Sequence, residues 1–90
     1  MAVWRVELSD LAEDDLAALD KLTRHRVIDA LDWLSENFEN ITPIPLGGIW
    51  KGFFKLRVGD WRVIYELKHE WRVLVIHYID HRNKIYKRRR

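Results

Sequence analysis

Hydrophobic side chains change their spacing once along the chain, and this change separates a helical part from a strand-rich part. Apolar and polar residues alternate over 4–8, which predicts a short half-buried strand. Apolar residues then recur at helical spacing and predict a helix over about 10–22, with Ser9 as its N-cap. A second helix, with Thr23 as its N-cap, should reach Phe38. Because the link is short, the two helices should form an antiparallel hairpin.

The second part of the chain has the period of a β-sheet. Residues 39–52, which hold both prolines, predict a loop. Gly59-Asp60 is typical of a two-residue hairpin turn between two alternating strands. A third strand over about 71–79 is apolar on both faces, as a central strand is. The order β-α-α-β-β-β predicts an α+β fold, a twisted and mostly antiparallel sheet with the helical hairpin on one face.

Composition limits the class of protein. Ninety residues predict one domain, made of a helical hairpin over about 10–38, a loop over 39–52, a sheet over 53–80 and a basic tail over 81–90. The tail is too poor in apolar residues to hold a firm structure alone. The absence of cysteine excludes disulfides, thiol nucleophiles and cysteine-ligated zinc. No apolar run is long enough to cross a bilayer or to form a signal peptide, so we expect a cytoplasmic protein with no membrane partner.

The net charge of +2 hides a strong segregation of charge. Residues 1–46 hold four basic and ten acidic residues, whereas residues 47–90 hold twelve basic and four acidic ones. A merely solubilising surface would mix the signs, so we expect the second half to contact a polyanion. Charge alone does not distinguish RNA, DNA and acidic protein.

The predicted turn fixes which residues of the hairpin face each other. With the turn at Gly59-Asp60, Arg57 lies directly opposite Arg62. The other strand positions place Lys55 on the same face as both arginines, all within about 5–8 Å of one another. The opposite face is apolar and should pack on the helices; it consists of Phe54, Leu56, Val58, Trp61, Val63 and Tyr65.

Opposed arginines destabilise a fold by up to roughly 1 kcal/mol unless something neutralises them. One alternative is an internal counterion, from Glu66, Asp80 or a helix carboxylate. The functional alternative is an exposed phosphate site, in which arginine forks bind oxygens and Lys55 is a mobile, titratable cation. This second alternative predicts a positively lined hollow held open by the hairpin. Further candidate phosphate contacts are Lys51, Lys84 and Lys87.

The residues after the last predicted strand supply the remaining candidates. Arg82 could lie beside Arg62 if their strands are adjacent, and Tyr86 either stacks on a base or ribose or packs the tail onto the sheet. His81 neighbours the basic residues, and imidazoles titrate near neutral pH. His77 and His81 look like a metal-ligand pair, but residues four apart on a strand are about 13 Å apart, too far to share an ion. We therefore expect no metal and no cofactor.

Two segments resemble the motifs of a known family. Residues 54–65, which read FKLRVGDWRVIY, closely resemble the hallmark stretch of the RelE/ParE superfamily of type II toxin–antitoxin toxins. The C-terminal signature of that superfamily is resembled by residues 81–86, HRNKIY, and its Leu-x-Gly-like loop by Leu46-Gly47. The similarity spans nearly the whole chain, and it is greatest to the RelE-like mRNA interferase branch.

This resemblance implies a toxin that cuts mRNA in the A site of the small ribosomal subunit without a metal, and so inhibits translation. It implies a cognate antitoxin as partner, with operator DNA bound only through the antitoxin complex. The family's active-site positions correspond to Lys55, Arg57, Arg62, Arg82 and Tyr86. His81 occupies a position that is lysine in some members and histidine in others. RelE-like enzymes often carry a second lysine where this chain has Phe53.

Two alternatives share this fold. The ParE branch inhibits DNA gyrase without nuclease activity, and a degenerate member would bind its antitoxin without being toxic. A fold by itself does not specify an activity, so the arrangement of the candidate polar residues must discriminate between the nuclease and these two alternatives.

The nuclease reaction needs no metal if the RNA's own 2′-OH attacks the neighbouring phosphorus, giving a 2′,3′-cyclic phosphate and a 5′-OH. We expect Lys55 to act as the base, if its charged neighbours favour its neutral form. Arg62 should stabilise the phosphorane and Arg57 should position the phosphate. Tyr86 should orient the nucleotide. The leaving oxygen receives a proton from His81, which is the better acid, or is stabilised by Arg82, as family precedent indicates.

Overall fold

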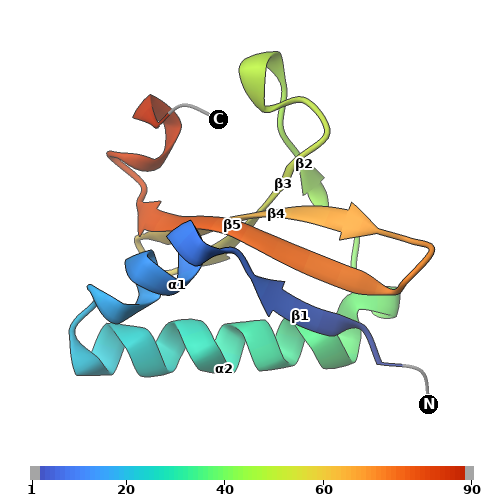
Figure 1. The fold of residues 1–90 in the computed structure, drawn as a ribbon, viewed down its shortest axis with the longest axis horizontal. Coiled ribbons are helices and arrows are strands. Elements are labelled where there is room, and N and C mark those ends of the chain that lie inside the picture. Colours follow the sequence, from blue (N-terminus) through green and yellow to red (C-terminus); the bar gives the residue numbers. More distant parts are fainter. Residues whose placement is uncertain (1–2, 89–90) are drawn as a thin grey trace.

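In the computed structural model, which describes residues 3–88, two helices cover one face of a five-stranded sheet (Figure 1). In chain order the elements are β1 (Arg5–Leu8), α1 (Asp10–Ala17), α2 (Lys21–Asn37), η1 (Phe38–Asn40), β2 (Ile44–Pro45), η2 (Gly48–Trp50), β3 (Phe54–Val58), β4 (Trp61–Lys68), β5 (Val73–His81) and η3 (Ile85–Lys87), where η marks a 3₁₀ turn. The strand order is β1-β5-β4-β3-β2, with only the β1–β5 pair parallel, so the predicted α+β fold is confirmed. Within residues 3–88 no helix is long and apolar enough to cross a membrane.

The first helix is shorter than the sequence predicts. Ser9 caps it as expected, accepting a hydrogen bond from a first-turn amide at 3.1 Å, but α1 ends at Ala17. Asp20 then caps α2 in place of Thr23, whose backbone amide donates to the Asp20 carboxylate at 3.4 Å. The guanidinium of Arg24 donates to the carbonyl oxygens of Leu16, Ala17 and Leu19, at the end of α1 and just beyond it. These two polar side chains stabilise the break between the helices.

The hairpin of β3 and β4 has the predicted register. Val58 pairs with Trp61 and Arg57 with Arg62, and Gly59 in the turn has a φ of 61°. The apolar row of the hairpin packs against α2, as expected, in the main core. The buried side chains of this core include Val27, Leu31, Leu34, Phe38, Val63, Tyr65, Leu74 and Ile76.

β5 lies inside the sheet between β1 and β4, as its two apolar faces predict. The strand starts at Val73 rather than at 71, because residues 69–72 form a turn in which Arg72 has a φ of 52°. A β-bulge at Ile64 and Tyr65 shifts the register of β4 against β5. Beyond the bulge, the side chains of β5 therefore lie on the opposite face of the sheet from the one that regular alternation predicts.

A second apolar cluster, on the face of the sheet opposite α2, is not predicted by the sequence. The predicted loop over 39–52 contains η1, β2 and η2, and both η2 and the tail rise from this face (Figure 1). The second cluster consists of Trp50, Phe53, Ile64, Tyr78 and Ile85. Because Ile85 is fully buried in it, the sheet holds the tail in place. Residues 89 and 90 of the predicted basic tail lie outside the described residues.

Candidate functional site

Three basic side chains lie together on the face of the sheet opposite α2, and we call Lys55, Arg57 and Arg62 the basic cluster. Lys55 and Arg57 lie two residues apart on β3, and Arg62 of β4 pairs directly with Arg57. Lys55 pairs with the buried Ile64, so the basic cluster borders the second apolar cluster. Arg57 is exposed, and the other two are half-buried. The structure thus brings these three sequence-predicted residues together.

Arg62 has a second role that the sequence does not reveal. Its Nη1 donates hydrogen bonds to the carbonyl oxygens of Gly59 and Trp61, both at 2.8 Å. The guanidinium therefore lies over the hairpin turn and helps to fix it. Its Nε and Nη2 have no hydrogen-bond partner within residues 3–88, so they remain available to an anion.

The carboxylates near the basic cluster are engaged with other cations. Asp80 is the β5 partner of Arg62 in the register, but its carboxylate lies 3.5 Å from Arg88. Asp60 in the turn lies 3.8 Å from Arg82. Over residues 3–88, no carboxylate forms an ion pair with any member of the basic cluster. Asp80 is thus the carboxylate nearest to the cluster in the register, and within residues 3–88 its ion pair is with Arg88 rather than with Arg62.

Tyr86 reaches the basic cluster from the tail. The Nζ of Lys55 lies 5.9 Å from the centroid of the Tyr86 ring, and Tyr86 is 42% exposed. The anchoring role that the sequence allows for Tyr86 is filled by its neighbour Ile85. The Tyr86 ring is therefore accessible to stack on a base beside a cation.

Arg82 and His81 lie at the hairpin turn. The backbone amide of Arg82 donates to the carbonyl oxygen of Asp60 at 2.8 Å, and its guanidinium faces the Asp60 carboxylate. Arg62 also contacts this turn, through the carbonyl oxygen of Gly59, so both arginines lie at the same end of the hairpin. The His81 ring meets the Trp61 indole edge-on, with centroids 5.5 Å apart, and Trp61 packs against the main core. His81 is therefore directed toward the helix side of the sheet, away from the basic cluster.

The remaining predicted cations border the same open face. Lys51 follows η2, Lys84 precedes η3 and Lys87 ends it, and all three are exposed. η2 and the tail, which carry these three residues, both rise on the side of the sheet that carries the basic cluster (Figure 1). Phe53 is buried against Trp50, with ring centroids 5.9 Å apart, so an aromatic anchor occupies the position of the family's second lysine.

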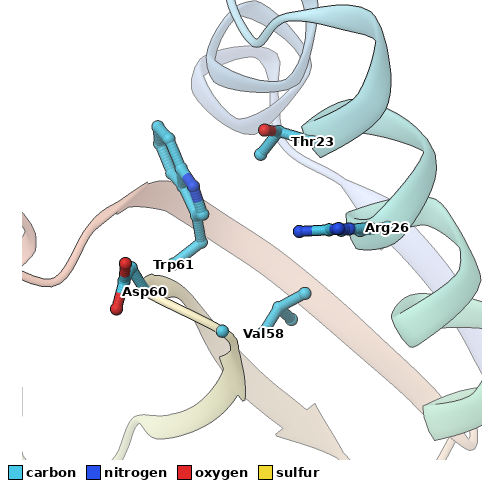
Figure 2. A pocket seen from close by; sticks show the side chains of 6 residues that line it. Thr23, Arg26, Val58, Asp60 and Trp61 are labelled. Atoms are coloured by element: carbon cyan, nitrogen blue, oxygen red, sulfur yellow. The ribbon is translucent and has the colours of Figure 1, made fainter.

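The hairpin turn borders a cavity, but not the one that the sequence predicts. It has a volume of about 200 Å³ and lies between α2 and the turn, where Arg26 extends from the helix toward the hairpin (Figure 2). Its lining residues are Thr23, Arg26, Val58, Gly59, Asp60 and Trp61. No member of the basic cluster lines it, so this cavity is not the predicted basic hollow. The basic cluster is instead a surface on the opposite side of the hairpin.

A polar group on the open face was missed by sequence reasoning. Glu66 Oε1 lies 3.0 Å from His77 Nε2, and its Oε2 lies 3.0 Å from Lys68 Nζ. Burial raises the pKa of Glu66, but the hydrogen bonds and charges of His77 and Lys68 outweigh burial and hold that pKa below its usual value. The bulge beside Tyr65 makes His77 an extra residue of β5, which no periodicity reveals. Within residues 3–88 no three histidine or carboxylate side chains are grouped to hold a metal ion.

Comparisons with known proteins agree on the kind of protein. The sequence profile of a family described as the ParE toxin of the type II toxin–antitoxin system parDE matches residues 6–86. A chain of the toxin–antitoxin complex RelBE2 from Mycobacterium tuberculosis is 28% identical with a TM-score of 0.79, over 90% of this chain and 93% of that chain. The fold is also that of a RelE–RelB complex from Pyrococcus horikoshii (22% identity, TM-score 0.71, over 93% and 99%) and of the isolated RelE toxin of Escherichia coli (16%, 0.70, over 87% and 83%). A comparison with curated protein sequences found no match.

Proposed function

The chain belongs to the family of ParE toxins of type II toxin–antitoxin systems, within the RelE/ParE superfamily, and we propose that it acts as a RelE-like endoribonuclease. It cuts mRNA in the ribosomal A site through the RNA's own 2′-OH, without a metal, and so inhibits translation. The observation that carries this proposal is the pairing of Arg57 with Arg62 beside Lys55 and Tyr86, without an ion-paired carboxylate within residues 3–88. A surface that only had to fold would gain nothing from this arrangement.

The geometry supports a division of roles in the reaction. Arg57 binds the scissile phosphate, and Arg62 stabilises the crowded phosphorane through the N–H groups that the turn does not use. Lys55 takes the proton of the 2′-OH when its amine is neutral, while Tyr86 stacks on the nucleotide and sets its orientation.

The leaving 5′ oxygen is stabilised electrostatically by Arg82, which is exposed at the same end of the sheet, and takes its proton from water. His81 acts as the acid only if its ring leaves Trp61 when RNA binds. Exposed amines bind the flanking RNA phosphates, and these are Lys51, Lys84 and Lys87.

A cognate antitoxin is the protein partner in this proposal, and the helices are its docking surface. Solved relatives include toxin chains in complex with the antitoxin RelB. The two helices expose large apolar side chains among acidic ones, a surface that suits a basic, amphipathic segment. The exposed apolar side chains are Leu11, Leu22, Ile28 and Trp33. Operator DNA is then contacted only through the antitoxin, and the toxin acts in the cytoplasm.

The test is to induce the chain alone in bacteria and map transcript 5′ ends, then to repeat the cleavage with purified ribosomes and a defined mRNA. We expect new ends inside translated regions, carrying 5′-OH and 2′,3′-cyclic phosphate. Arg57→Ala should slow cleavage by about 10²-fold or more. The matched control is Arg5→Ala, which removes an exposed arginine from an ion pair with Glu7 at 2.9 Å and should leave cleavage unchanged. Growth arrest with intact transcripts would contradict the nuclease proposal.

The second candidate function is inhibition of DNA gyrase, which is favoured by the match to the ParE family profile. It predicts inhibited supercoiling with purified gyrase and no RNA cleavage. It also predicts that Arg57→Ala reduces the inhibition no more than Arg5→Ala does, because a protein-binding surface does not need arginines that bind phosphate in bidentate fashion. A chain that does neither and still binds its antitoxin would be a non-toxic member of the family.

A further inference from the structure

The last described residue of the tail is held by two carboxylates and an aromatic ring. Arg88 Nη1 lies 2.7 Å from Asp15 Oδ2 and 3.5 Å from Asp80 Oδ2. The guanidinium also lies 4.6 Å from the centroid of the Tyr78 ring. The side chains of Arg88 and Asp15 are only 25% and 18% exposed, so this ion pair is more buried than the other arginine–carboxylate pairs within residues 3–88.

Asp15 is in place because β1 is shorter than β5. The β1–β5 pairing stops at Leu8 and Ile76, so the next backbone groups of β5 lack a strand partner on that edge. The side chains that begin and line α1 satisfy them instead. Ser9 Oγ donates to the carbonyl oxygen of His77 at 3.2 Å, and the amide of Ile79 donates to Asp15 Oδ2 at 2.9 Å. One carboxylate oxygen of Asp15 thus joins α1, β5 and the tail.

Tyr86 lies between the two anchors that fix the end of the tail. The first is Ile85 in the second apolar cluster, and the second is Arg88. Among residues 3–88, the loss of the second anchor would leave Ile85, the first residue of η3, as the buried anchor of this turn. Its positive charges would also be repelled by Lys55 and its neighbours. The position of the Tyr86 ring beside Lys55 therefore depends on Arg88.

We propose that Arg88, Asp15 and Asp80 are positioning residues that hold Tyr86 over the basic cluster for RNA cleavage. This inference rests on the proposed nuclease function for its catalytic consequence, but the anchoring itself is measurable without RNA. The anchor fixes the position of the Tyr86 ring, so its loss should lower the rate of cleavage in the bound complex. It should leave the salt dependence of RNA binding unchanged.

The anchoring is tested first by amide hydrogen exchange of the purified full chain. The backbone amides of residues 87 and 88 donate hydrogen bonds of 3.0 and 3.4 Å to carbonyl oxygens three residues earlier, and these bonds close η3. Both amides are also present when Arg88 is replaced by alanine. In Arg88→Ala their exchange should accelerate by about tenfold or more. Asp15→Asn keeps an oxygen to accept from Ile79 and removes only the charge, so it should have the same effect. Arg5→Ala is the control for losing one arginine, and it should leave these amides unchanged.

The positioning role is tested by cleavage on programmed ribosomes. Arg88→Ala should lower kcat by the same factor as Tyr86→Ala, about tenfold or more, with KM little changed. The double variant should be no slower than Tyr86→Ala alone, and Arg88→Lys should recover part of the rate. If Arg88 instead contacts RNA phosphate, its removal should raise KM and reduce the salt slope by about one. That result would overturn the proposal.

The remaining outcomes separate this inference from the proposed function. Unchanged exchange in both Arg88→Ala and Asp15→Asn would overturn the anchor, whatever the chain does to RNA. Faster exchange with an unchanged kcat would overturn the positioning role. A chain that cleaves no RNA but shows the faster exchange would refute the nuclease function and the positioning role while leaving the anchor in place.

Discussion

Arg57 and Arg62 face each other directly across the β3–β4 hairpin, on the face of the sheet that the helices leave open. Opposed like charges destabilise a sheet, and no carboxylate within residues 3–88 forms an ion pair with either arginine. We therefore expect Arg57→Thr to raise the free energy of unfolding by up to about 1 kcal/mol at low salt, and to abolish most RNA cleavage. Urea denaturation at low and high salt measures the stability, and the gain should shrink as salt screens the repulsion.

Arg62→Thr is the matched comparison, because it removes the same repulsion from the other strand. It also removes the hydrogen bonds to the carbonyl oxygens of Gly59 and Trp61. Its free energy of unfolding should therefore fall, by about 1 kcal/mol, while cleavage is lost as in Arg57→Thr. Equal stability changes in the two variants would mean that the turn contacts of Arg62 contribute nothing.

The place of the family's second lysine is structurally closed to a cation in this chain. Phe53 is buried between the rings of Trp50 and His77, at centroid distances of 5.9 and 5.0 Å. Phe53→Lys should lower the free energy of unfolding by about 2–4 kcal/mol, because it removes an aromatic anchor and buries a charge. Phe53→Leu should cost less, since it stays apolar. A lysine variant that is as stable as the leucine variant and cleaves faster than the parent would show that the site accepts a second amine.

The turn of the hairpin depends on one left-handed residue. Gly59 has a φ of 61°, and a Cβ added there would meet no atom within 4 Å, so only backbone strain opposes a side chain. Gly59→Ala should therefore cost about 1–2 kcal/mol of stability. Gly47 is equally uncrowded but has an extended backbone, with a φ of −119°, so Gly47→Ala should be close to neutral. Thermal unfolding of both variants measures the difference, and equal melting temperatures would contradict this account.

The fold and the basic cluster were predictable where local chemistry is sufficient. A two-residue turn at Gly59 fixes the register of both strands, and the register alone places Arg57 against Arg62. Ser9 capped its helix as predicted for the same reason, since a cap is a contact within one turn. The end of α1 was missed because it depends on Arg24, whose guanidinium returns from the next helix to carbonyl oxygens that periodicity does not mark.

The rest of the open face needed tertiary information. The bulge at Tyr65 changes which face of the sheet the later side chains of β5 occupy. The alternation of apolar and polar residues in the sequence therefore does not indicate that His77 contacts Glu66. Ile85 is the single aliphatic residue of the basic tail, and only the ring-lined surface of the sheet makes it an anchor. The contact of His81 is also not visible in the sequence, which places His81 next to Arg82, whereas its ring meets the Trp61 indole edge-on.

Glu66 provides a prediction about pH. Its folded-state pKa lies below the usual 4.5, since the bonds from His77 and Lys68 outweigh burial. A carboxylate of this kind stabilises the fold fully above its unfolded pKa, and the contribution is lost as the pH falls through the folded value. Glu66→Gln should therefore be less stable than the parent at pH 7, by no more than about 1 kcal/mol because the group is partly exposed. The difference should shrink as the pH falls below the usual pKa of a glutamate and through the lower folded-state pKa. Glu70→Gln, in the exposed β4–β5 turn, should show no such trend in urea denaturation across the same range. A stability difference for Glu66→Gln that persists at the acid end would contradict the assignment to the ionised carboxylate.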